Sequence, residues 1–122
     1  MKHLWFPLIF ALIFAVAFIA KAAPTLSVDD AREKLREGAK LIDVRTAEEF
    51  ASGRVSGAVN IPLDMVTNDL PRRFPDKSTT LLLHCRSGRR SGIAEKELRK
   101  LGYTNVFNIG SLERAQQVAS QK

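Results

Sequence analysis

Three consecutive leucines, Leu81 to Leu83, lead through His84 to Cys85 and restrict the fold of this 122-residue chain more than any other stretch. A short apolar run of this kind is typical of a strand buried on both faces of a sheet. After Cys85 the sequence changes to one glycine and three arginines, and a helix-period segment follows from Ile93 to Leu101. A buried strand, a short loop and a helix form the repeating unit of parallel α/β sheets.

The rest of the chain repeats this alternation. Four segments are predicted to be strands: Ala39 to Val44, Ala58 to Ile61, Thr79 to His84 and Asn105 to Ile109. Further helices are predicted after Ser27, after a Thr46–Glu49 capping box, weakly over Leu63 to Leu70, and over Leu112 to Ala119, with Pro71 and Pro75 bracketing a loop or distorted turn. We expect an α/β domain, a central parallel sheet of about five strands with helices on both faces.

The first residues have the composition of an export signal. Met1 to His3 is basic, and Leu4 to Ala20 carries no charge. Ala20-Lys21-Ala22 places small residues at the two positions that a signal peptidase recognises before its cleavage site. We expect a signal peptide over residues 1–22 and a single domain over 23–122, in the periplasm or otherwise exported. The alternative is an uncleaved membrane anchor, because 17 uncharged residues lie at the lower edge of a membrane span.

Cys85 lies where a thiol becomes reactive. It ends a strand and faces a helix N-terminus, where free N–H groups and the helix dipole favour an anion. Gly88 lets the loop turn its N–H groups inward, and no acidic residue occurs between Lys77 and Ala94. Cys85 is therefore the candidate nucleophile, with a small buried hydrophobic side chain as the alternative. The candidate anion-binding residues follow it: Arg86, Ser87, Gly88, Arg89, Arg90 and Ser91.

Charge and composition exclude several functions. Lys2 and Lys21 belong to the leader, so 17 basic and 13 acidic residues remain and the net charge falls from +6 to +4. This modest excess of positive charge is suited to binding small anionic substrates. No part of the sequence resembles a nucleic-acid-binding module. His84 is the only histidine after Ala22, and neighbours on a strand point to opposite faces, so a Cys–His pair is disfavoured. One Cys beside one His does not make a metal site, and we expect no metal or cofactor.

Asp43 and Arg45 also come at a strand end, where sites form in parallel sheets. They are candidate supporting residues of the site. An ion pair that ties the strand end to neighbouring loops is the alternative role. Arg72 and Arg73 are expected on a solvated surface that attracts anions.

Five blocks of sequence resemble single-domain rhodaneses, in the same order and at similar spacing, from about Leu26 to Gly110. The blocks are Leu41 to Arg45 (Leu-Ile-Asp-Val-Arg), Glu49-Phe50, Gly57 to Pro62, Cys85 to Ser91 (Cys-Arg-Ser-Gly-Arg-Arg-Ser) and Gly102 to Val106. With an export signal, the chain is similar to the periplasmic, phage-shock type of that family. The resemblance implies a thiosulfate-type sulfurtransferase with a persulfide on Cys85, a small anionic sulfur donor held by the loop, and cyanide or a thiol as acceptor.

Three departures from the family pattern are visible. Gly53 to Ala58 reads Gly-Arg-Val-Ser-Gly-Ala where many members have Gly-His-Ile-Pro-Gly-Ala, and Gly110-Ser111 replaces a double glycine. The aromatic-bearing end that often follows is replaced by Leu112 to Ala115. That end can border the active site in this family, so it bears on substrate range.

Two rival functions stay open at this point. Cysteine phosphatases and arsenate reductases can share this fold, but they carry an arginine six positions after the cysteine, where this chain has Ser91 and places Arg90 one residue earlier. The shorter arrangement is expected for a sulfur acceptor. The other rival is a protein that carries or senses sulfane sulfur without turnover. A thiol–disulfide oxidoreductase is disfavoured because there is no second cysteine to resolve a mixed disulfide.

Overall fold

The computed structural model describes residues 26–120, so the expected signal peptide lies outside the described residues. Within that range no helix is both long and apolar enough to cross a bilayer. Helices and strands alternate in the order α1 (Val28–Arg36), β1 (Lys40–Asp43), α2 (Ala47–Ser52), β2 (Val59–Asn60), the 3-10 helix η4 (Leu63–Met65), α3 (Val66–Arg73), β3 (Leu81–His84), α4 (Arg89–Lys100), β4 (Val106–Gly110) and α5 (Leu112–Ala119).

The sheet is parallel throughout, with its strands in the order β2-β1-β3-β4. β1 lies beside β3 with Asp43 opposite His84, so the two strands end level with each other. The predicted α/β class and parallel sheet are confirmed. The described residues hold four strands, against the expected number of about five, and these four correspond to the four segments predicted from the sequence.

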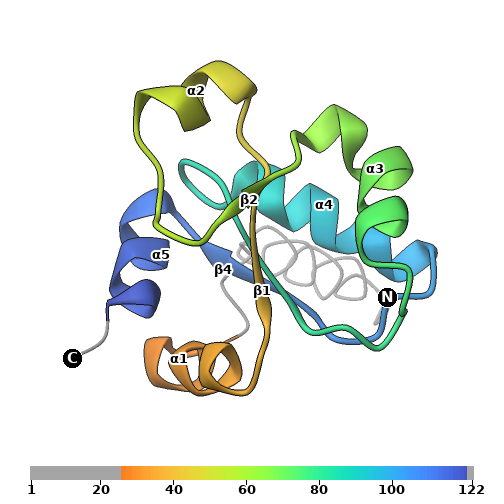
Figure 1. Ribbon diagram of the computed structural model, residues 1–122, viewed down its shortest axis with the longest axis horizontal. Helices are drawn as coiled ribbons and strands as arrows, with labels where there is room; N and C mark the ends of the chain where they lie inside the picture. The colour runs from red at the N-terminus through yellow and green to blue at the C-terminus, as the bar shows by residue number, and fades with distance from the viewer. Residues whose placement is uncertain (1–25, 121–122) are drawn as a thin grey trace, which may run out of the picture.

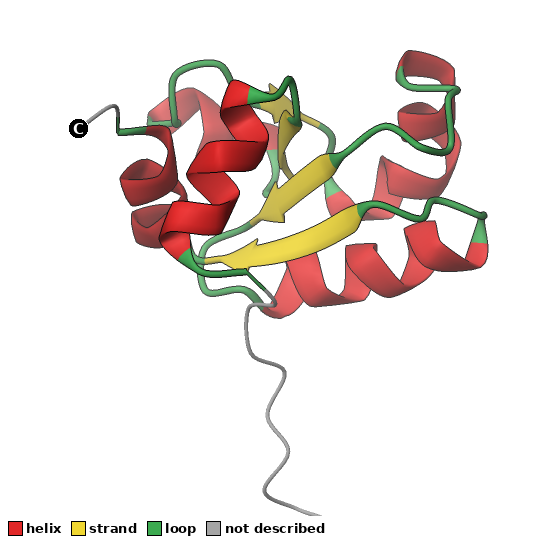
Figure 2. Ribbon diagram, turned by 90° about the horizontal axis from the view of Figure 1, so that it is seen from below, coloured by secondary structure: helices red, strands yellow, loops and turns green. Residues whose placement is uncertain are grey.

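Helices cover both faces of the sheet, as predicted (Figure 1, Figure 2). Alternate residues of β3 point to opposite faces: Leu81, Leu83 and the following Cys85 join a core with Leu70 of α3 and Leu98 of α4. Leu82 points the other way. The second core combines it with residues of α1, β1, β4 and α5: Ala31, Leu41, Ile109, Ala115 and Val118. β3 is thus buried on both sides, which explains its run of leucines.

Side-chain caps fix three of the helix starts. The Ser27 hydroxyl accepts from the Asp30 N–H at 3.0 Å, and the Ser111 hydroxyl accepts from the Arg114 N–H at 3.1 Å. Thr46 and Glu49 form the reciprocal capping box that the sequence predicts at the start of α2. In Figure 1, α2 lies beyond the C-terminal end of β1, at the edge of the sheet where β3 also ends.

Pro71 does not end a helix as predicted, because α3 continues through it to Arg73. Proline removes one backbone hydrogen bond from a helix interior. The Phe74 N–H still donates to the Leu70 carbonyl at 2.8 Å, and Val66 and Leu70 are fully buried on one side of the helix. Tertiary packing of that apolar side therefore outweighs the local effect of the proline.

The helix after Cys85 begins earlier than predicted, at Arg89 instead of Ile93. Gly88 precedes it in a left-handed conformation with φ of +99°, a turn that glycine adopts without steric cost. Arg89, Arg90 and Ser91 are consequently the first turn of α4 and not part of a loop. The true loop is only Arg86 to Gly88.

The packing of α4 makes a matched test of the core possible. We expect Leu98→Ala, which empties a fully buried position, to lower the free energy of unfolding by about 2–5 kcal/mol. Leu101→Ala changes the same residue type at the end of the same helix, where the side chain is 39% exposed, and should cost less than about 1 kcal/mol. Urea denaturation of both variants measures the difference. Equal losses would contradict the assignment of α4 to the core.

Candidate active site

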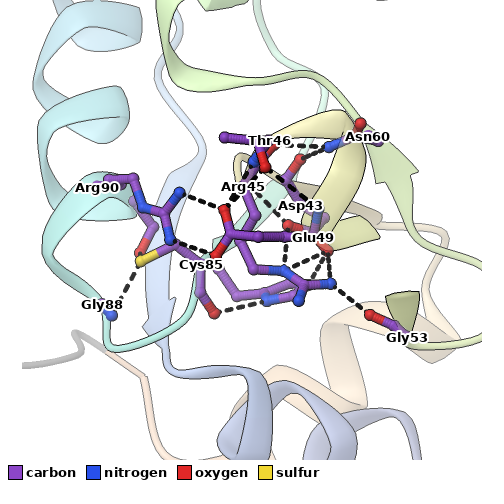
Figure 3. A network of polar contacts seen from close by, with 11 residues as sticks. Asp43, Arg45, Thr46, Glu49, Gly53, Asn60, Cys85, Gly88 and Arg90 are labelled. Atoms are coloured by element: carbon purple, nitrogen blue, oxygen red, sulfur yellow. Dashed lines mark hydrogen bonds and ion pairs between the residues drawn. The ribbon is translucent and has the colours of Figure 1, made fainter. Parts of the chain in front are cut away.

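Cys85 lies directly beyond the end of β3 with its side chain in the core, only 1% exposed. The Gly88 N–H donates to the Cys85 Sγ at 3.0 Å (Figure 3). Backbone hydrogen bonds hold both sides of the loop against the end of β4: Cys85 N–H donates to the Gly110 carbonyl and Leu112 N–H to the Arg86 carbonyl. The sulfur is therefore enclosed by a turn that is itself anchored to the sheet.

Two opposing effects set the acidity of this thiol. Burial raises the pKa of Cys85, because a thiolate loses hydration in the core. The Ser91 hydroxyl, 3.5 Å from the sulfur, lowers it, as do the backbone N–H groups of Ser91, Gly88 and Ser87. The net result is a pKa below the ordinary cysteine value. These backbone donors and the first turn of α4 are the groups that the sequence analysis expects to activate the thiol.

His84 points away from the thiol, as the strand geometry predicted. Its ring is fully buried, with Nδ1 3.2 Å from the Cys85 carbonyl oxygen and Nε2 3.6 Å from the Asp43 carboxylate. Burial is the main cause that lowers the pKa of His84 and keeps the ring neutral. His84 therefore packs behind the backbone of Cys85 and has no contact with the sulfur that would make it a general base.

Asp43 and Arg45 form a buried ion pair at the end of β1. The Arg45 guanidinium donates to both Asp43 carboxylate oxygens, at 2.7 to 3.0 Å, and to the Gly53 carbonyl at 2.7 Å. The Asn60 amide donates to the carbonyls of Asp43 and Arg45, which ties β2 to the same place. These contacts join β1 to β2 and to the end of α2, the geometry of the structural role that the sequence left as an alternative.

The three arginines after Cys85 occupy different positions. Arg86 and Arg89 are exposed, while Arg90 is partly buried and pairs with Glu49 of α2 through two hydrogen bonds of 2.7 and 3.0 Å (Figure 3). The hydrogen bond to Glu49 is the main cause that raises the pKa of Arg90, and the Cys85 sulfur raises it further. Arg90 is therefore the arginine that borders the sulfur.

Sequence reasoning missed one residue of the site, Asn108, and the ion pair that Glu49 forms with Arg90. The Asn108 side chain is 3% exposed; its Oδ1 accepts from the Ser91 hydroxyl at 2.7 Å and from the Gly110 N–H at 2.9 Å. Its Nδ2 donates to the Gly88 carbonyl at 3.0 Å. Asn108 thus fixes both ends of the turn around the sulfur. A polar residue between Phe107 and Ile109 in an otherwise apolar strand was the visible signal.

Two hollows flank the Glu49–Arg90 pair. One of about 370 Å³, which we call the polar hollow because most of its residues are charged or polar, is lined by Arg45, Glu48, Glu49, Ser52, Arg86 and Leu112. A more apolar one of about 430 Å³ is lined by Val44, Thr46, Pro62, Leu63, Asp64 and Arg90. Glu49 borders the first and Arg90 the second, so the ion pair lies between them. Over residues 26–120, His, Cys, Asp and Glu side chains do not gather in threes as a metal site requires.

The pKa of Cys85 gives a direct test of which groups activate it. The single hydrogen of the Ser91 hydroxyl is shared between Asn108 Oδ1 and the Cys85 sulfur, and its loss disfavours the thiolate, so Ser91→Ala should raise the midpoint of the alkylation rate against pH by about 0.5 to 1 unit. At neutral pH the variant should therefore react more slowly with iodoacetamide. His84→Asn should leave the midpoint almost unchanged, because the ring faces away from the sulfur. The reverse ranking would establish a Cys–His pair.

Comparison with known proteins identifies the family. The family model described as rhodanese-like domain matches residues 27–115. Thiosulfate sulfurtransferase PspE of Escherichia coli (strain K12) is 43% identical over 72 residues, which cover 59% of this chain and 69% of that protein. The human thiosulfate:glutathione sulfurtransferase is 34% identical over 105 residues, covering 75% and 91%.

Two solved structures are similar across the same region. A structure of a rhodanese with anions from E. coli superposes with a TM-score of 0.61 at 40% identity and covers 63% of this chain and 91% of that one. The human single-domain sulfurtransferase TSTD1 gives a TM-score of 0.68 at 32% identity, covering 83% and 100%. The family match spans α1 to the first half of α5 and contains every residue of the site described above, so this chain belongs to the rhodanese-like domain family.

Proposed function

We propose that this protein is a thiosulfate sulfurtransferase in which Cys85 carries the transferred sulfur as a persulfide. The observation that carries the proposal is a buried sulfur with a lowered pKa, held by the Gly88 N–H and the first turn of α4. The chain is an enzyme of the sulfurtransferase class, to which its relatives from E. coli and human belong by name. A buried thiolate beside cationic side chains suits a donor that is small and anionic.

The reaction has two displacement steps. In the first, the Cys85 thiolate attacks the outer sulfur of thiosulfate; the new S–S bond forms as the old one breaks, and sulfite leaves with the bonding electron pair. The enzyme is left with a persulfide anion on Cys85. In the second, cyanide or a thiolate attacks the terminal sulfur, and the Cys85 thiolate leaves. The products are thiocyanate or a new persulfide, and neither step requires an external oxidant or reductant.

The residues at the sulfur each have a role in this scheme. The N–H groups of Ser87, Gly88 and Ser91 stabilise negative charge, first on the thiolate and then on the terminal sulfur of the persulfide. Arg89, exposed at the start of α4, attracts the donor, and Arg86 of the loop and Arg90 bind its anionic end. No proton has to be moved by a histidine, because the reacting groups are already anions. Asp43 and Arg45 support the site by holding β1, β2 and α2 together.

The size of the turn favours sulfur over phosphate. Six positions after Cys85 the chain has Ser91, whose hydroxyl faces the sulfur and Asn108, where a cysteine phosphatase has an arginine for a tetrahedral oxyanion. The terminal sulfur of a persulfide is smaller than a tetrahedral oxyanion and needs a smaller turn around it. We therefore favour sulfur transfer over phosphatase or arsenate reductase chemistry on the same fold.

We also propose that the protein is exported by its first 22 residues, with the mature domain beginning at Ala23. The uncharged run and the small residues around Lys21 support cleavage by a signal peptidase. Expression of the full chain in a bacterium with an outer membrane, followed by fractionation and N-terminal sequencing, tests this. A protein that begins at Ala23 in the periplasmic fraction is the expected result. Full-length protein in the membrane fraction would instead establish an anchor.

Mass spectrometry tests the chemistry directly. After incubation with thiosulfate, the intact protein should gain the mass of one sulfur atom, and cyanide should remove it. Cys85→Ser conserves the shape of the side chain but removes the nucleophile, so it should take up no sulfur and show no turnover while its circular dichroism stays unchanged.

Parallel assays with thiosulfate plus cyanide and with an aryl phosphate separate the enzyme classes. Sulfur uptake without turnover would identify a sulfane-sulfur carrier, and hydrolysis of the phosphate would identify the phosphatase. Turnover near wild type in Cys85→Ser would reject the proposal.

Substitutions of two exposed arginines, Arg86 and Arg72, should differ in their effect on the kinetics with thiosulfate. Arg86→Ala removes a charge from the polar hollow beside the loop and should raise the apparent KM for thiosulfate several-fold. Arg72→Ala removes an equal charge from the exposed end of α3, and should mainly reduce the dependence of kcat/KM on salt. Steady-state kinetics at two ionic strengths measure both. Equal effects of the two substitutions would show that the hollow does not bind the donor.

A further inference from the structure

The Glu49–Arg90 ion pair joins two helix starts across the site. Arg90 is the second residue of α4, Glu49 is the third residue of α2, and 41 positions separate them in sequence. Each nitrogen of the Arg90 fork donates to one carboxylate oxygen, the bidentate geometry that arginine also uses to bind anionic ligands. Both side chains are more than a quarter exposed, so solvent and small ions reach the pair.

Arginine is an unfavourable residue at the start of a helix, because the helix dipole is positive there. The first turn of α4 contains no acidic residue, so Glu49 supplies from α2 the negative charge that this helix start lacks. An anionic substrate that reaches the thiol would supply the same charge at the same place. Glu49 therefore occupies a position for which a substrate anion competes.

The Glu49 carboxylate is also held in place and held ionised. The Thr46 N–H and hydroxyl donate to its Oε1 at 3.0 and 3.1 Å. The hydrogen bond from Arg90, followed by the one from the Thr46 backbone, lowers the pKa of Glu49 to about 2. The competing charge therefore persists at every pH at which the Cys85 thiol ionises, and the capping box keeps it within reach of Arg90.

We propose that Glu49 is a specificity-determining residue that weakens the preference of the site for multiply charged anions. Its carboxylate neutralises Arg90, the cation that borders the Cys85 sulfur (Figure 3). A doubly charged donor therefore gains less binding free energy than it would from an unpaired Arg90. Neutral and singly charged sulfur compounds lose less binding free energy through this neutralisation. The naming of sulfur donors rests on the proposed function, whereas the charge selectivity at Cys85 does not.

The test compares two alkylating reagents of similar size and different charge, iodoacetate and iodoacetamide, on the full chain. Glu49→Gln removes the charge but preserves the fold, because glutamine also serves at the third position of a capping box. We expect the ratio of iodoacetate to iodoacetamide rate constants to rise by about three- to tenfold. Any change in the pKa of Cys85 affects both reagents equally and cancels in the ratio.

Glu48→Gln is the matched control. It removes an equal charge from the neighbouring, exposed residue of α2, which borders the same polar hollow. We expect the ratio to change by less than about twofold, because an exposed charge without a fixed partner is strongly screened. Equal increases in the two variants would show that only net charge matters, and would overturn the proposal.

Thiosulfate kinetics complete the design. Glu49→Gln should lower the KM for thiosulfate several-fold, because the substitution removes a competitor for Arg90. An unchanged or lower alkylation ratio in Glu49→Gln would mean that Glu49 only orients Arg90, and would reject the selectivity role. A raised ratio in a protein without thiosulfate turnover would keep that role and reject the proposed function instead.

Discussion

The left-handed turn at Gly88 is the constraint on which the site depends. The Gly88 N–H reaches the Cys85 sulfur at 3.0 Å, and the φ of +99° at the same residue then turns the chain into α4. A Cβ at this position would lie 3.3 Å from the Gly110 Cα, so the space is restricted as well as the backbone angle. The same turn begins α4 at Arg89 and directs the first N–H groups of that helix to the sulfur. This glycine thus sets the direction in which α4 leaves the turn, and with it the positions of Arg90 and of the Ser91 N–H.

The two faces of the sheet carry side chains with different roles at the end of β3. On one face, Cys85 meets Gly88, Ser91 and the start of α4. On the other, His84 lies against Asp43, which is held by Arg45. A single residue step along the strand separates a reactive side chain from a buried polar support. The pKa of the thiol is lowered by the Ser91 hydroxyl and by backbone N–H groups, and not by a histidine.

Short-range signals in the sequence predicted most of the fold. The leucine run, the caps at Ser27 and Thr46, and the position of Cys85 at a strand end depend on neighbouring residues, and the structure confirms them. The start of α4 and the path through Pro71 were predicted wrongly, because the Gly88 turn and the packing of Leu70 oppose local preferences. The missed contacts of the site come from tertiary structure. Asn108 and Glu49 reach the loop from other elements, and no spacing along the chain reveals that approach.

These long-range contacts also explain why a helix start rich in arginine is stable without substrate. Arg89 and Arg90 oppose the dipole of α4, and their positive charges repel each other. Glu49 offsets part of that cost through Arg90, and Asn108 holds the turn through Ser91 and Gly88 independently of any anion. The turn is therefore held by hydrogen bonds within the protein, and such contacts lower the cost of ordering a site on binding. The consequence of this preorganisation is a site whose anion affinity depends on the competition between a substrate and one built-in carboxylate.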